Sequence, residues 1–261
     1  MHRMRRSGRK VPEVTAYFWI VKILTTAMGE ATSDFSIHRI DPVIAVVLGG
    51  IALVIALALQ LLVRRYVAYV YWLAVSMVAV FGTMVADVIH VKFGVPYVVS
   101  AVGFAVALAV VFVTWHRTEG TLSIHSIDSP RRELFYWATV LITFALGTAV
   151  GDLTAYTLHV GFFYSGVAFA LVIAVPAMAY RFGTLNGVTA FWFAYIVTRP
   201  LGASFADWMG TPRSLGGLNL GRGTVSASLT VLLLLFVGYL TLTRVDVEDQ
   251  AGRTAVTNLA R

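Results

Sequence analysis

Long apolar runs separated by short polar segments make up most of the sequence. At about 20 residues per crossing, they predict eight membrane-spanning helices, at residues 15–36, 43–63, 67–90, 95–115, 134–157, 160–180, 188–208 and 226–243. The chain then divides into a basic N-terminal segment (1–14), a first membrane half (15–115), a polar linker (116–133), a second membrane half (134–243) and a tail (244–261). We therefore expect an all-α, polytopic membrane helix bundle.

The odd-numbered spans share one register, which reads Trp, nine residues, Gly, four residues, Asp. Three of them also carry Thr four residues before the Gly. The intervals between successive aspartates are 53, 65 and 55 residues, so each unit is a patterned helix followed by a plain apolar helix. Because every unit crosses the membrane twice, all four repeats point the same way. The residues are Trp19, Trp72, Trp137 and Trp192; Gly29, Gly82, Gly147 and Gly202; Asp34, Asp87, Asp152 and Asp207; and Thr25, Thr143 and Thr198.

The repeated pattern resembles a family of bacterial membrane proteins with four tandem repeats, each of two transmembrane segments and a characteristic tryptophan. This family is described only as a repeat of unknown function. The resemblance covers residues 15–243. It implies eight transmembrane helices in four parallel two-helix repeats, and it implies no activity.

Composition and charge support a membrane protein and suggest its orientation. The chain is 58% hydrophobic and 13% charged, and it has no cysteine, which excludes disulfides and thiolate metal sites. Of its 20 Lys and Arg residues, fourteen fall on the side of the termini, four on the opposite side and two inside spans. The positive-inside rule therefore predicts a multi-pass protein of the bacterial inner membrane with both termini in the cytoplasm. The net charge of +7 then reflects orientation and contact with the lipid bilayer, not nucleic-acid binding.

Charged residues inside the predicted spans occur only in the odd ones. Because charge in the hydrocarbon region is costly, we expect the odd helices inside and the even helices as a lipid-facing ring. On a helical wheel, the Trp and the position four before each Asp lie within about 60° of that Asp. This face is the candidate lining of a cavity, and the opposite Thr-Gly face is a candidate packing seam. The predicted substrate or ion path is Glu30, Asp34, Asp87, Asp152, Asp207, Thr83 and Thr148, with Lys22 and Arg199 as internal counter-charges.

Each of these sets also has a structural interpretation. The tryptophans could anchor an interface or simply pack, and the glycines and threonines could only pack. The aspartates could cap helices at the outer surface, because Asp34 lies about 28 Å along its helix from Thr15. Lys22 and Arg199 each stand eight residues from an acid of their own helix, so they must reach neighbouring helices or an anionic group. Asp87 and His90, at i and i+3, are a candidate metal pair.

The sequence therefore favours a secondary transporter or permease for a small cation. That cation could be a metal ion, and transport could be coupled to protons. The alternative is a non-transporting membrane sensor or assembly scaffold in which the carboxylates are structural. The sequence has no Ser-His-Asp, HExxH or nucleophile-elbow pattern, so we expect neither an enzyme nor a cofactor.

Overall fold

The computed structural model describes residues 9–247, and within this range it contains eight long α-helices and no strand. The helices start and end within five residues of the predicted spans, so the helical prediction is confirmed. The outermost parts of the predicted N-terminal segment and C-terminal tail, 1–8 and 248–261, lie outside the described residues. The helices are α1 (Ala16–Arg39), α2 (Pro42–Leu62), α3 (Ala68–Asp87), α4 (Tyr97–Glu119), α5 (Pro130–Asp152), α6 (Phe162–Arg181), α7 (Gly187–Gly210) and α8 (Arg222–Thr243).

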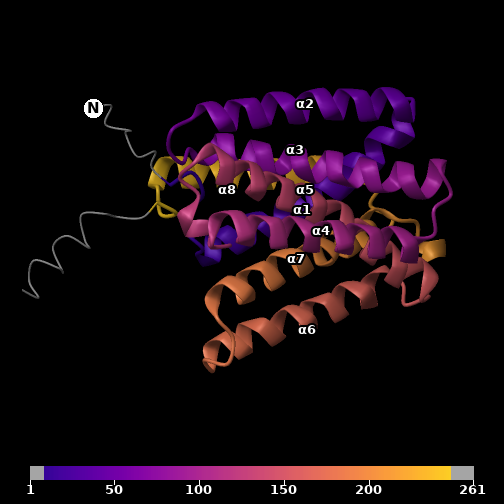
Figure 1. The fold of residues 1–261 in the computed structure, drawn as a ribbon. Helices are drawn as coiled ribbons and strands as arrows, with labels where there is room; N and C mark the ends of the chain where they lie inside the picture. The colour runs from indigo at the N-terminus through magenta and orange to yellow at the C-terminus, as the bar shows by residue number, and fades with distance from the viewer. Residues whose placement is uncertain (1–8, 248–261) are drawn as a thin grey trace, which may run out of the picture.

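The odd helices form a closed inner ring in which α1 contacts α3, α3 contacts α5, α5 contacts α7 and α7 returns to α1. Each even helix packs outside the next odd helix of the ring: α2 on α3, α4 on α5 and α6 on α7. The last helix, α8, packs on α1 and so completes the cycle. In Figure 1, α2 runs along the upper edge and α6 along the lower edge, with odd helices between them. Only 17% of the apolar window of α2 and 28% of that of α6 is buried, against 61% for α3 and 67% for α5. The inner and outer layers thus agree with the prediction.

Six of the described helices are long and apolar enough to cross a membrane. The other two, α1 and α7, do not reach this degree of hydropathy. These two helices carry Lys22 and Glu30, and Arg199, respectively, all of which are buried inside the ring. The structure is therefore a helical bundle of a kind compatible with a membrane, and Lys22, Glu30 and Arg199 place buried charge on two adjacent inner helices.

The repeat glycines are the points at which the inner ring closes. A Cβ atom on Gly29 would overlap Ala79 of α3, and one on Gly82 would overlap Phe144 of α5. Continuing around the ring, a Cβ atom on Gly147 would overlap Arg199 of α7, and one on Gly202 would overlap Thr26 of α1. Each glycine thus faces the same repeat position on the next odd helix, eight residues before its Asp. This cyclic pattern gives the bundle pseudo-fourfold symmetry, and glycine permits the close approach.

Two of the repeat aspartates end their α-helices and are followed by a π-helical turn. Asp87 precedes η1 (Val88–Lys92), and Asp152 precedes η3 (Leu153–Thr157). Single π-turns of this kind are frequent at functional sites. We call this end of the ring, where the four repeat aspartates lie, the Asp end, and the opposite end, where the repeat tryptophans lie, the Trp end.

Candidate functional site

Arg199 links all four inner helices at the centre of the ring. Its Nη2 atom lies 2.5 Å from Oε2 of Glu30 on α1, and it donates to Oγ1 of Thr148 on α5 at 2.8 Å. It also donates to the hydroxyl of Thr83 on α3, and Nη1 donates to the carbonyl oxygen of Thr26 at 3.5 Å. The Arg199 side chain is fully buried, and that of Glu30 is 4% exposed. The structure thus brings together four of the residues singled out in the sequence: Glu30, Thr83, Thr148 and Arg199.

Glu30, Thr83 and Thr148 occupy the same place in their repeats, four residues before the Asp. The fourth repeat has Ala203 there, and it supplies Arg199 one turn away instead. A small residue at this position leaves the centre of the ring open on the side of α7. The guanidinium of Arg199 therefore meets an acid and two hydroxyls that the other repeats present.

Lys22 lies nearer the Trp end than this cluster, and it has no acidic partner. Its ammonium nitrogen stands 4.0 Å from the ring centroid of Phe144 and 4.1 Å from that of Tyr195. It is fully buried and makes no hydrogen bond among the described residues. Cation–π contact with two rings offsets part of its desolvation cost. The predicted pairing of Lys22 with an acid on a neighbouring helix is therefore not what the structure shows.

The four repeat aspartates form a second layer at the Asp end, above the Arg199 cluster. Their carboxyl groups lie near enough to one another and to Glu30 to interact electrostatically. The side chain of Asp34 is 17% exposed and that of Asp152 is 15% exposed. The carboxyls are thus partly accessible at the helix ends. They do not lie within the sealed centre of the ring.

The four aspartates differ in their partners. Asp34 is paired with Arg222 of α8, whose Nε lies 2.7 Å from Oδ2. Asp87 accepts a hydrogen bond of 3.3 Å from Ser33. Asp207 has no hydrogen bond or ion pair within the described part of the chain. Arg222 was not predicted as a partner from the sequence, because it follows a Gly-rich segment almost 190 residues away from Asp34.

The candidate metal pair Asp87 and His90 is not assembled as predicted. Nδ1 of His90 faces Asp152 at 3.7 Å, and Nε2 forms a 2.5 Å hydrogen bond with Ser100. Its ring also lies edge-on to Tyr97, with centroids 4.4 Å apart. Within residues 9–247, no group of three or more His, Asp or Glu side chains has the geometry to hold a metal ion. Because a π-turn follows Asp87, His90 is directed towards α4 and α5.

The repeat tryptophans form an aromatic layer near the Trp end. Each is contacted by the residue that precedes the Trp of the previous odd helix. The ring centroids of Phe18 and Trp72 are 5.7 Å apart. The corresponding separations are 5.8 Å for Tyr71–Trp137, 6.1 Å for Tyr136–Trp192 and 5.8 Å for Phe191–Trp19. Trp72, Trp137 and Trp192 are buried, and Trp192 donates from Nε1 to the carbonyl oxygen of Leu122 at 2.9 Å. In this structure these three side chains pack between helices.

The repeat threonines are buried in the same bundle and bond within their own helices. Thr25 donates to the carbonyl oxygen of Lys22, Thr143 to that of Thr139, and Thr198 to that of Ala194. All three side chains are at most 1% exposed. Their hydroxyls are satisfied locally, so these residues contribute packing at the helix contacts.

A polar cluster that the sequence did not predict closes the Trp end. Lys10 was expected in the basic fringe, yet it is 5% exposed and lies 2.6 Å from Oε2 of Glu133. Gln60 donates to the other carboxylate oxygen of Glu133 at 3.2 Å. Lys10 also donates to the carbonyl oxygen of Leu61 at 3.2 Å. The segment before α1 is therefore held across the Trp end by the end of α2 and the start of α5.

A second contact at the Trp end involves Tyr66 and Asp246. The Tyr66 hydroxyl donates to the Asp246 carboxylate, and the backbone of Asp246 accepts a 3.0 Å hydrogen bond from Glu13 N–H. Burial raises the pKa of the Asp246 carboxyl above its ordinary value, although the hydrogen bond from Tyr66 acts in the opposite direction. The segment before α1 and the segment after α8 are thereby joined at this end.

A family model for the repeat of unknown function DUF347 matches the chain four times, at residues 17–66, 70–121, 135–183 and 190–246. The chain belongs to this family. Each match contains one odd helix and the even helix that follows it, so the DUF347 repeat corresponds to the unit that generates the pseudo-fourfold ring. No curated protein and no solved structure matches the chain.

Proposed function

We propose that this DUF347 protein is a membrane transporter for a small cation that enters at the Asp end. The observation that supports the proposal is that four aspartates, one from each repeat, lie at the same end of the ring as the buried Glu30. A ring of carboxylates raises the local concentration of cations, as acidic rings do in cation pores. Such a layer is costly to keep for stability alone, because its members repel one another.

Arg199 supplies the gate in this proposal. Its guanidinium binds the carboxylate of Glu30 and the hydroxyls of Thr83 and Thr148. It therefore acts as a tethered cation that closes the centre of the ring. A substrate cation moving inward from the aspartates competes with Arg199 for Glu30. Differential binding of this kind shifts a closed state towards an open one. Protons exchange with the same carboxylates, which provides a basis for coupling.

Flux measurements in liposomes test this function. We expect purified protein to carry a proton or metal-cation flux that Asp207→Asn and Glu30→Gln abolish. Asp41 provides a matched control, because it caps α2 at the same end but lies outside the ring and is exposed. Asp41→Asn keeps a good capping residue and should retain the flux. Normal flux in the Asp207 and Glu30 variants would refute a cation path through the ring.

A second candidate is a non-transporting sensor or scaffold. The complete burial of Arg199 and the closure of the Trp end by Lys10 and Glu133 favour it, because both are features of a static core. Absence of flux with protons, alkali cations and divalent metals, in protein that unfolds cooperatively, would support this alternative over transport.

A further inference from the structure

A crevice of about 1070 Å³ lies between α1, α6 and α7, on the side of the bundle nearest the Trp end. Its walls are mainly apolar and come from all three helices. This volume is slightly above the usual range for small-molecule sites, which is about 300–1,000 Å³. The principal apolar lining residues are Trp19, Ile23, Ile173, Ala177, Phe191 and Leu201.

Comparison between repeats explains why this crevice exists. In the second repeat, Phe112 and Trp115 of α4 cover Trp192, with ring centroids 5.2 and 5.8 Å away. These two residues stand 25 and 28 positions after Asp87. The same offsets from Asp152 lead to Ala177 and Tyr180 of α6.

The substitution of a ring by a methyl group leaves space over Trp19. Ala177 occupies the position of Phe112, and Tyr180 is 59% exposed where Trp115 is fully buried. Trp19 is accordingly the repeat tryptophan that remains partly exposed. The crevice is therefore a specific departure from the repeat pattern, located where the outer layer meets the ring.

Apart from Thr198, the polar lining residues gather at one end of the crevice. Glu13 is already paired with Arg9 and lies 3.7 Å from His125. Arg181, at the end of α6, has no acidic partner within the described residues. The first residues of α7, from Gly187, also line this end. Asn186 caps the N–H of Thr189, and the N–H groups of Gly187 and Val188 make no hydrogen bond among the described residues. The charges at this end therefore favour an anion.

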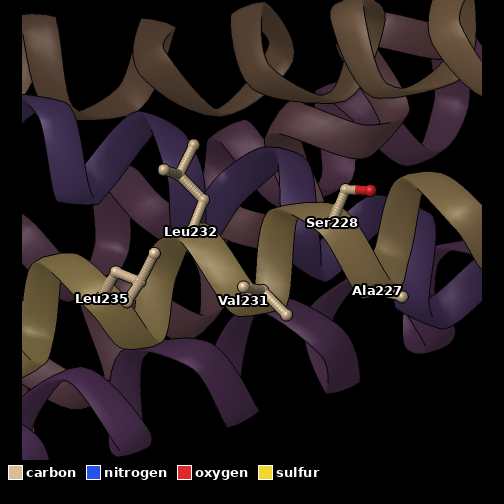
Figure 2. A pocket seen from close by; sticks show the side chains of 5 residues that line it. All are labelled: Ala227, Ser228, Val231, Leu232 and Leu235. Atoms are coloured by element: carbon tan, nitrogen blue, oxygen red, sulfur yellow. The ribbon is translucent and has the colours of Figure 1, made fainter.

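We propose that the crevice holds an acyl chain of an anionic phospholipid, with the chain against Trp19 and Ala177 and the phosphate beside Arg181. The occupant follows from the position of the crevice: α6 belongs to the exposed outer layer, so the space is open to bilayer lipid. The depression on α8 provides a contrast, because a single helix lines it and no charged group is present (Figure 2). The proposal does not depend on cation transport.

Native mass spectrometry of protein purified from membranes with equal phosphatidylglycerol and phosphatidylcholine tests the chain site. Ala177→Phe restores the ring that the second repeat has, and it should abolish the retained lipid. Met178→Phe is the matched control, because Met178 is the next residue and is 54% exposed. Retention of the same lipid by Ala177→Phe would overturn the proposal, as would a retained neutral compound in place of a phospholipid.

The headgroup assignment has its own measurement. Arg181→Gln should lower the preference for phosphatidylglycerol about fivefold, the effect expected of one basic residue at an anionic surface. Arg117→Gln, at the end of α4, should leave it unchanged. Equal retention of both lipids by the unmodified protein would overturn the assignment.

Thermal unfolding shows whether each variant folds. If Ala177→Phe does not fold, the placement of the acyl chain is tested instead by fluorescence quenching with phosphatidylglycerol that is brominated on its acyl chains. Trp19→Phe should then remove the quenched component of the emission. Unchanged quenching in Trp19→Phe would overturn the placement of the chain.

Discussion

The guanidinium of Arg199 and the carboxylate of Glu30 form a 2.5 Å ion pair between α7 and α1, and neither side chain has more than 4% of its surface exposed. Burying two charges costs several kcal/mol per ion, and the pair is stable only because further hydrogen bonds complete it. Thr83, Thr148 and the carbonyl oxygen of Thr26 supply those bonds. The pair therefore connects all four repeats through one side chain.

Breaking this pair from one side should destabilise the protein strongly. Glu30→Gln leaves Arg199 without a counter-charge, and we expect a loss of about 3–5 kcal/mol in the free energy of unfolding. Arg199→Met should cost a similar amount, whereas the double variant should recover a large part of the loss. Thermal or denaturant unfolding in detergent measures these differences. Arg131→Gln is a suitable control, because Arg131 pairs with Glu119 while 65% exposed; a loss as small as that of the control would refute the role of the buried pair.

The repeat glycines predict a contrast between two Gly→Ala changes. Gly147→Ala forces a Cβ atom into Arg199 and should destabilise the bundle by about 1–3 kcal/mol through overpacking. Gly103→Ala, in the outer helix α4, adds a methyl group that meets no atom within 4 Å. It should be neutral or stabilise the protein by up to about 1 kcal/mol through helix propensity. Equal melting temperatures for the two variants would contradict the close contact in the ring.

The sequence predicted the helices and layers well, because they depend on local and repeated signals. Apolar length located the helices, and the confinement of charge to odd spans separated the inner from the outer layer. A straight helical wheel was less informative for the centre. Lys22, Glu30 and Asp34 are separated by eight and four residues. A row of this spacing winds slowly around a straight helix, but it follows the line of contact where two helices cross at an angle. The wheel therefore placed the tryptophans on the cavity face, whereas three of them pack between helices.

Contacts between distant segments were beyond the sequence for a different reason. Lys10 belongs to a basic run that is typical of a membrane surface, and nothing local distinguishes it from its neighbours. The burial of Lys10 depends on Gln60 and Glu133, which lie 50 and 123 residues away from it in the sequence. The pairing of Asp34 with Arg222 has the same origin. Such long-range pairs require the arrangement of helices, which periodicity does not contain.

The partners of the aspartates predict opposite effects of neutralising two of them. Asp34→Asn removes the counter-charge of Arg222 and should lower the melting temperature. Asp207→Asn removes a carboxylate that has no partner among the described residues and is repelled by the others, so it should leave the melting temperature unchanged or raise it. Both variants are isosteric and lie in the same layer, which makes them controls for each other. A lower melting temperature for Asp207→Asn than for Asp34→Asn would show that the assignment of partners is wrong.

The contact between Tyr66 and Asp246 predicts a specific dependence of stability on pH. Burial raises the pKa of Asp246 in the folded state above the ordinary value of 3.8, which the carboxyl has in the unfolded chain. As the pH rises through that interval, the unfolded chain releases the proton first, so the stability from this group is present at low pH and is lost at higher pH. Asp246→Asn removes this term, and its melting temperature relative to the unmodified protein should increase as the pH rises from about 3.5 to 7. Tyr66→Phe removes the hydrogen bond that opposes the shift, and it should make the loss at higher pH larger. A constant difference between Asp246→Asn and the unmodified protein across this range would refute the buried position of the carboxyl.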